Sequence, residues 1–188
     1  MPFRVLALLA LAVPAASAQG DWSSLAPGLG VAAPPAGGFG AEWTPTAGLR
    51  AGVTSPAYGG LVRAALGARG YAASRDDLPD FWLASASAGW GPTAALPRGL
   101  RLSGGVLAGV AHLRFEALDG VPFQNTTETE AAVGAWARLD VPVTGTVRLW
   151  TEAELLRVAL AEPVTLATGS AGLAVRVETP GWLRGLLR

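Results

Sequence analysis

Few residues of this chain have the type and spacing of catalytic groups. The sequence contains one histidine, His112, and no cysteine. A lone histidine could act as a general base, but no serine stands beside it in the segment His112-Leu113-Arg114. One histidine without any thiolate also falls short of the ligand set of a zinc site. We therefore expect His112 to be a polar residue near the rim of a strand, and we predict no catalytic residue, cofactor or metal.

Three acidic residues, Asp76, Asp77 and Asp80, lie close together in one polar segment. Their carboxylates could bind a cation weakly, but a solvated loop is the simpler interpretation. The tripeptide Asn125-Thr126-Thr127 matches a glycosylation sequon, and we interpret it as another polar loop. The chain has no phosphate loop, dinucleotide fingerprint or nucleophile elbow. The lone histidine and the lack of these catalytic motifs together predict that the protein is not an enzyme.

The first residues have the three parts of a secretory signal peptide. Arg4 supplies a positive charge, residues 5–13 are apolar, and Ala16 and Ala18 form a small-x-small cleavage site. We expect cleavage after Ala18, so that residues 1–18 are removed and residues 19–188 form one exported domain.

The bulk composition excludes several classes of protein. The 14 basic and 14 acidic residues give a net charge of zero, so no strong field favours nucleic acid. An exported chain without cysteine needs no disulfide. Although 51% of the residues are hydrophobic, no uninterrupted apolar run of the mature chain is long enough for a transmembrane helix.

Apolar and polar residues instead alternate with a period of two, as in strands with two different faces. In residues 130–141, for example, alanine, valine and leucine alternate with Glu130, Trp136, Arg138 and Asp140. Short and long connections also alternate, which is typical of an up-and-down meander. The sequence predicts an all-β fold with about eight antiparallel strands, at residues 27–44, 46–55, 60–73, 80–94, 99–115, 128–141, 146–160 and 164–178.

The contents of the two faces indicate which one faces outward. Trp82 and Trp90 delimit a row of alanines in segment 81–90, and Ser85 and Ser87 lie on the other face. Eight residue steps, tilted as in a barrel, cover roughly 20 Å of depth, near the thickness of an outer-membrane apolar band. Indole rings favour both boundaries of such a band. We predict a transmembrane β-barrel with an aromatic girdle that contains Trp43, Trp82 and Trp90; a secreted, soluble β-sandwich is the alternative.

The opposite face carries small residues and charges and would line the lumen. An eight-stranded barrel has room inside only for side chains, and buried charges must pair. We predict a closed, polar lumen network of Glu42, Arg50, Arg63, Arg69, Glu130, Arg138, Asp140, Arg148, Glu152, Glu154 and Arg176.

Three places depart from the regular alternation. The segment Ala33–Gly38 contains two prolines, which cannot donate to a strand ladder. The shared parity of Leu29, Val31 and Trp43 favours one bent strand across it; a turn would raise the strand count to nine or ten. The parity also slips near His112 and near residues 155–156, which fits a bulge or a strand that leaves the membrane, and residues 152–160 also fit a short helix.

With its export signal, meander and alternation, the chain resembles small bacterial outer-membrane β-barrel proteins over residues 27–178. The last strand, 170–177, is similar to the assembly signal of that family, with valines at the usual aromatic positions and the tail 179–188 following it. Trp182 in this tail is a candidate interfacial anchor. The resemblance implies the bacterial outer membrane as the location, with outer-membrane lipid, lipopolysaccharide and the barrel-assembly machinery as partners. It leaves the oligomeric state open.

Three functions fit such a barrel. The first is a structural, anchoring or adhesive role carried by the loops, and the mixed-sign lumen favours it. The second is a narrow, porin-like channel. The third is a barrel-embedded lipid-modifying enzyme; the lipid hydrolases of this membrane pair a histidine with a serine two residues away, and His112 lacks that serine.

Overall fold

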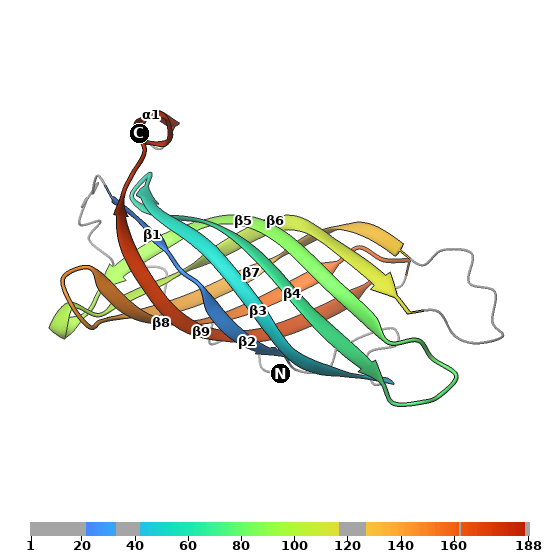
Figure 1. The fold of residues 1–188 in the computed structure, drawn as a ribbon. Coiled ribbons are helices and arrows are strands. Elements are labelled where there is room, and N and C mark those ends of the chain that lie inside the picture. Colours follow the sequence, from blue (N-terminus) through green and yellow to red (C-terminus); the bar gives the residue numbers. More distant parts are fainter. Residues whose placement is uncertain (1–21, 33–41, 117–126, 162, 187–188) are drawn as a thin grey trace, which may run out of the picture.

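The computed structural model describes residues 22–32, 42–116, 127–161 and 163–186 (Figure 1). The predicted signal peptide, with Ala16 and Ala18, lies outside these residues, as does most of the Asn125-Thr126-Thr127 tripeptide. No helix within the described ranges is long and apolar enough to cross a membrane.

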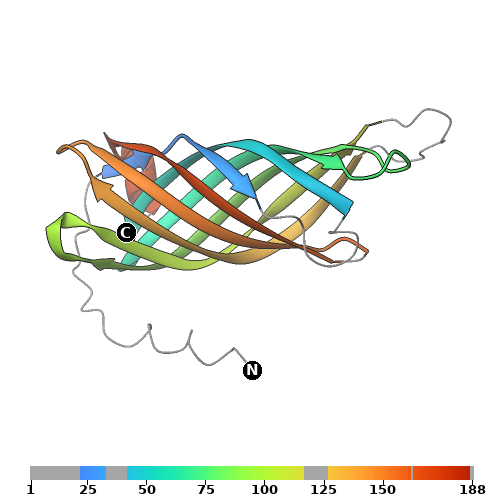
Figure 2. The ribbon, with the colours of Figure 1, turned by 90° about the horizontal axis from the view of Figure 1, so that it is seen from below.

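The fold is one antiparallel sheet that closes on itself. Its strands are β1 (Trp22–Leu25), β2 (Gly28–Ala32), β3 (Trp43–Ala57), β4 (Gly60–Ala73), β5 (Phe81–Ala95), β6 (Arg101–Phe115), β7 (Thr127–Pro142), β8 (Val147–Val158) and β9 (Val164–Glu178). From β3 onward each strand pairs with the next, and β1 and β2 pair with both β3 and β9. The result is a barrel, seen from two directions in Figures 1 and 2. The predicted all-β, up-and-down barrel is confirmed, and the sandwich alternative is wrong because there is a single closed sheet.

The strands β1 and β2 are two parts of one barrel strand. Leu25 pairs with Val53 before the break and Gly28 pairs with Arg50 after it, so the register on β3 is the same on both sides. Between them, the backbones of Ala26 and Gly52 exchange two hydrogen bonds. Pro27 interrupts the ladder only because it has no N–H group. Nine strand segments therefore make eight barrel strands, the number that the sequence predicts.

The prediction of one bent strand over residues 27–44 is wrong. The first barrel strand occupies residues 22–32, and β3 begins at Trp43 as its antiparallel neighbour. The chain therefore reverses direction between Ala32 and Trp43, and Pro34 and Pro35 lie between these two strands, outside the described residues. A proline pair cannot join a ladder, which suits this position between strands.

A β-bulge near the start of β3 changes which residues face inward. Pro45 pairs with Tyr71, but Gly48 pairs with Arg69, so β3 has one extra residue between these two pairs. The Thr46 side chain replaces the missing ladder contacts, because its Oγ1 lies 3.1 Å from the carbonyl oxygen and 3.2 Å from the amide nitrogen of Gly70. An extra residue inverts the alternation of a strand. Trp43 therefore faces the interior.

The outer and inner surfaces of the barrel have opposite chemistry. Aliphatic side chains lie exposed on the outer surface, including Leu29, Leu49, Leu66, Val106, Val133 and Leu173. The inner surface contains the buried charges, including Arg63, Arg138, Asp140, Glu152 and Glu154. This is the reverse of a soluble barrel and is the arrangement of membrane barrels.

The two parity slips in the sequence are not bulges. The pairing of β6 with β7 continues through His112 opposite Thr129, and the pairing of β7 with β8 continues through Leu155 and Leu156. Residues 147–158 form a strand, so the helix alternative is wrong over this range. Instead, the interior becomes apolar toward the long-loop end, with Leu83, Leu113, Leu156, Val158, Val164 and Leu166 in one buried cluster.

The other end of the barrel holds the short turns and the C-terminal tail. Tyr58 and Gly59 join β3 to β4 with φ angles of 51° and 69°, as in the tight turns of β-hairpins. After β9, the buried Thr179 hydroxyl lies 3.0 Å from the Ser23 hydroxyl. The short helix α1 (Gly181–Leu186) follows beyond this end (Figure 1) and exposes Trp182.

Candidate functional site: the polar lumen

Four charged side chains meet across the lumen. Arg50 comes from β3, Arg63 from β4, and Glu152 and Glu154 from β8. Arg63 donates through Nη1 to Glu152 Oε1 at 2.7 Å and through Nη2 to Glu154 Oε2 at 2.6 Å. Arg50 contacts the same two oxygens, at 2.5 Å and 3.1 Å. Each guanidinium thus bridges both carboxylates, and we call these four residues the lumen quartet.

Strand geometry and burial explain the lumen quartet. Residues two apart on a strand share a face, so Glu152 and Glu154 both point inward from β8. The side chains of Arg63 and Glu152 are 1% and 2% exposed, and ions this deeply buried must be paired. Arg63 also donates to the Ser87 hydroxyl at 2.9 Å and lies over the Trp136 ring at 5.5 Å. The quartet ties β3 and β4 to β8 through the barrel interior.

A second buried ion pair lies beside the quartet. Arg138 of β7 donates through Nε and Nη2 to the Asp140 carboxylate at 2.8–3.1 Å. Its guanidinium lies over the Trp150 ring at 4.9 Å. Arg138 is also the Cα partner of Glu152 on β8, so the two groups of charges are adjacent in the wall.

The short-turn end of the lumen is rich in arginine. Arg101 is the Cα partner of Asp140 and interacts electrostatically with Arg138, Arg148 and Arg176. Arg148 donates to the Gly99 carbonyl oxygen at 3.2 Å, and Arg176 is exposed at the end of β9. Arg148 and Arg176 thus lie at the mouth of the barrel rather than in the quartet.

Two other residues of the predicted lumen network lie apart from the quartet. Glu130 is half-buried on the inner face of β7, and its side chain makes no ion pair with any described residue. The prediction for Glu42 is wrong. Its side chain is 39% exposed at the edge of the barrel and lies 3.6 Å from Arg75 in the β4–β5 loop, because the bulge in β3 and the end of the strand place it outside the lumen.

The three tryptophans of the predicted girdle differ in position. Trp82 and Trp90 are 55% and 43% exposed on the outer surface, and Trp90 donates to the Ala57 carbonyl oxygen at 3.2 Å. Their place at a membrane boundary stays a prediction. The prediction that Trp43 faces outward is wrong, because the bulge turns its side chain inward. There it is 6% exposed and donates to the Pro79 carbonyl oxygen at 2.9 Å.

Sequence reasoning missed the aromatic part of the lumen. Tyr71, Trp136 and Trp150 are each buried to 4% exposure or less. Tyr71 stacks on Phe81 with ring centroids 4.6 Å apart. A signal existed in the sequence, because Trp136 has the same parity as Arg138. Tyr71 and Trp136 belong to the buried apolar cluster of the long-loop end, and Trp150 packs with Ala26 and Ala174 in a second cluster.

The other candidate residues from the sequence make ordinary polar contacts. Asp77 accepts from Arg75 at 2.9 Å, and this hydrogen bond holds the pKa of the Asp77 carboxyl below its usual range. Asp80 accepts from the Ala73 amide at 2.7 Å. Among the described residues, no group of three histidine or acidic side chains could hold a metal ion. His112 is exposed on the outer surface, with Nδ1 2.7 Å from the Thr129 hydroxyl.

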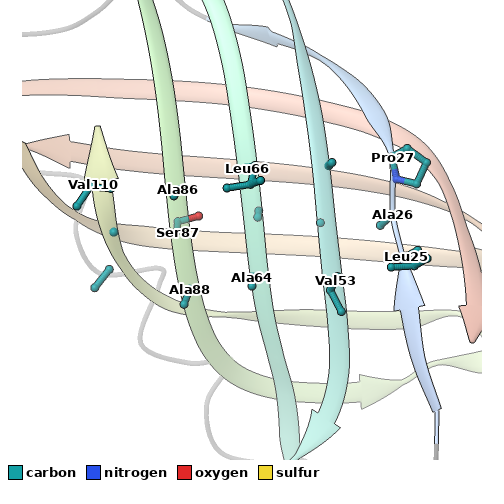
Figure 3. Close-up of a pocket in the computed structure, with 15 residues that line it drawn as sticks. Leu25, Ala26, Pro27, Val53, Ala64, Leu66, Ala86, Ser87, Ala88 and Val110 are labelled. Atoms are coloured by element: carbon teal, nitrogen blue, oxygen red, sulfur yellow. The ribbon is translucent and has the colours of Figure 1, made fainter. Parts of the chain in front are cut away.

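The outer wall has two neighbouring apolar depressions of similar volume. The first measures about 640 Å³ and lies over β1 and β3–β6, where the outward residues include Ala64, Ala86 and Ala88 (Figure 3); the second, of about 660 Å³, lies over β2–β4. Longer side chains such as Leu66 and Val110 form the rim of the first depression. It results from small residues on neighbouring strands, and it is separate from the polar lumen.

No model of a known protein family matches the sequence, and no curated protein sequence does. Solved structures match the fold. Neisserial surface protein A (NspA) matches with a TM-score of 0.58 and 15% identity, over 85% of this chain and 97% of that one.

Two further structures match at a similar level. The attachment invasion locus protein Ail of Yersinia pestis gives a TM-score of 0.55 at 15% identity, over 83% of this chain and 98% of that one; another structure of Ail contains the heparin analogue sucrose octasulfate. The outer membrane protein OprG from Pseudomonas aeruginosa gives 0.55 at 10% identity, over 85% and 97%. The chain therefore has the fold of small outer-membrane β-barrel proteins.

Proposed function

We propose that the protein is a bacterial outer-membrane barrel with a closed lumen, and that its loops carry a structural, anchoring or adhesive role. The observation that supports this most directly is the lumen quartet. Arg50 and Arg63 reach from one side of the barrel to Glu152 and Glu154 on the other, with all four contacts at 3.1 Å or less.

For ions to pass through the barrel, the four contacts of the lumen quartet would have to break. Removing one partner from a buried ion pair costs about 3–5 kcal/mol, and each guanidinium here holds two carboxylates. On the long-loop side of the quartet, the apolar cluster around Phe81 and Leu113 fills the interior. Conduction through the wild-type barrel would require both layers to rearrange, so a narrow channel is the less favoured function.

The outer surface supports a membrane location. Its aliphatic band would contact outer-membrane lipid and lipopolysaccharide, with Trp82 and Trp90 near the two boundaries. The signal peptide over residues 1–18 would direct export, and the alternating residues 170–177 of β9 would be recognised by the barrel-assembly machinery. By the convention of such barrels, the short turns face the periplasm and the long loops face outward.

An adhesive role has a specific ligand class to test. Ail is the protein whose structure holds a sulfated sugar, and the long-loop half of the present chain exposes Arg75, Arg114 and Arg157. Guanidinium groups bind sulfate oxygens well. Binding of a sulfated glycan to the refolded barrel, weakened by Arg114→Ala and Arg157→Ala, would support adhesion through this end.

Conductance in planar bilayers tests the closed lumen. We expect no steady single-channel current from the wild-type barrel, and openings in Glu152→Gln or Glu154→Gln because these changes remove the counter-charge of Arg63. Asp76→Asn, in an exposed loop, is the matched control and should stay closed. A robust wild-type current that these substitutions leave unchanged would contradict the proposal and favour a pore.

Two further measurements complete the test. Outer-membrane fractionation together with heat-modifiable gel migration checks the location and the barrel. Turnover of phospholipid or lipid A that His112→Ala abolishes would favour the lipid-hydrolase alternative instead.

A further inference from the structure

Small residues on the neighbouring strands β3, β2 and β9 leave room inside the barrel for the long side chain of one buried arginine, Arg69. Arg69 on β4 is the Cα partner of Gly48, which is followed in the row of paired residues by Gly30 on β2 and Ser170 on β9. A Cβ atom on Gly30 would lie 3.6 Å from Arg69 Nη2 and 2.9 Å from Ser170 Oγ. The guanidinium of Arg69 and the hydroxyl of Ser170 therefore face the same point inside the barrel, above Gly30.

The polar groups around this point have hydrogen-bonding capacity to spare. Arg69 Nη1, Ser170 Oγ and Tyr71 Oη are all buried without a hydrogen-bond partner. Arg69 and Ser170 are each 8% exposed, and Tyr71 is 1% exposed. The Tyr71 hydroxyl also lies close enough to the Arg69 guanidinium for a weak hydrogen bond and a charge interaction, although no hydrogen bond of 3.5 Å or less joins the two groups. All three side chains can donate, and buried donors of this kind are normally satisfied.

The charges in this layer of the lumen do not balance. Arg50, Arg63 and Arg69 face only two carboxylates, and Glu152 and Glu154 are both held by Arg50 and Arg63. Within the described part of the chain, Arg69 has no carboxylate within 4.0 Å. Glu152, the Cα partner of Ser170, is the next acidic group along the row. Glu130, the other inward carboxylate of the described residues without an ion pair, also lies more than 4.0 Å from Arg69. Arg69 is therefore left without a counter-ion in contact, and a buried charge in that position is costly.

We propose that Arg69, Ser170 and Tyr71 form a buried binding site for a small monovalent anion of the halide class. One guanidinium without a counter-ion in contact calls for one negative charge, and the site offers guanidinium and hydroxyl donors to accept it. The interior of an eight-stranded barrel leaves little room, which excludes large anions. The site is distinct from the lumen quartet and does not depend on whether the barrel conducts.

The stability of the refolded barrel in two anions tests the site. Urea unfolding in detergent is followed by heat-modifiable migration, in sodium chloride or in sodium gluconate at equal ionic strength. Because a ligand that binds only the folded state stabilises it, the wild-type midpoint should be higher in chloride. Arg69→Met should lose this difference, and it should be more stable than wild type in gluconate because it removes an uncompensated charge. Arg75→Met, in an exposed loop, should keep the wild-type difference.

Gly30→Ala is a second variant that keeps every charge. Its methyl group would lie 2.9 Å from Ser170 Oγ and occupy the place where the donors converge, so the chloride effect should also disappear. Crystals soaked in bromide give a direct readout, with an anomalous peak in contact with Arg69 and Ser170 in wild type and none in Arg69→Met.

Several results would overturn the proposal. These are equal wild-type midpoints in the two salts, a chloride effect that persists in Arg69→Met, or bromide-soaked crystals with only water beside Arg69.

Discussion

Arg63 and Glu152 lie 89 positions apart in the sequence, yet their side chains meet at 2.7 Å in the centre of the barrel. The two residues belong to strands that do not pair with each other. Their contact therefore depends on the closure of the sheet, and it makes the barrel interior a part of the structure that holds distant strands together.

Loss of a quartet carboxylate should destabilise the barrel strongly. We expect Glu152→Gln and Glu154→Gln each to lower the free energy of unfolding by about 3–5 kcal/mol, because Arg63 and Arg50 stay buried with less counter-charge. Urea unfolding in lipid vesicles measures this. Asp76→Asn in the exposed loop is the control and should change the free energy by less than about 0.5 kcal/mol. Equal effects at both sites would contradict a buried ion network.

Neighbouring positions on β5 should respond in opposite ways to charge. Ala86 points to the outer surface and Ser87 points into the lumen, where it accepts from Arg63 (Figure 3). Ala86→Arg should cost about 2–4 kcal/mol in lipid vesicles because the new charge faces hydrocarbon. Ala161→Arg, in the exposed β8–β9 loop, is the matched control and should be nearly neutral. A neutral Ala86→Arg together with a severe Ser87→Leu would mean that the two faces are inverted.

Two tryptophans with different positions should tolerate truncation differently. Trp43 is buried against Phe81, with ring centroids 5.7 Å apart, whereas Trp82 lies on the outer surface. Trp43→Ala should cost about 3–5 kcal/mol, as for other large buried residues, and Trp82→Ala should cost clearly less. Unfolding midpoints of the two variants provide the comparison. A larger loss in Trp82→Ala would contradict the bulge in β3.

Pro27 should be the single interruption in an otherwise continuous barrel strand. Ala26 bonds to β3, so the alternation of an antiparallel ladder directs position 27 toward β9, opposite Leu173. In Pro27→Ala the new amide should be protected from hydrogen exchange like its neighbours. The midpoint should change little, because the added hydrogen bond and the greater freedom of the unfolded chain are each worth about 1 kcal/mol. A fast-exchanging amide at position 27 would show that the strand is broken there.

Processing should occur after Ala18. Sequencing of the membrane-inserted protein should give Gln19 as the first residue, and Ala18→Arg should block cleavage because the site requires a small side chain. Finding Met1 at the start of the membrane form would contradict the signal peptide.

The alternation of side chains along single strands was predictable from the sequence. Arg63 and Arg69 lie inside, and Leu66 outside, because successive side chains of a regular strand point to opposite faces and the interior of this barrel takes the polar residues. This local rule is enough to predict the eight-stranded meander, the apolar outer surface and the polar lumen.

Two features depended on the tertiary structure. Trp43 faces inward because one extra residue between Pro45 and Gly48 inverts the alternation, and a bulge is a property of two paired strands that one strand's pattern does not reveal. The partners of Arg63 and the lone position of Arg69 are decided by the register around the closed barrel, since this register alone determines which side chains from non-adjacent strands reach the same depth in the lumen.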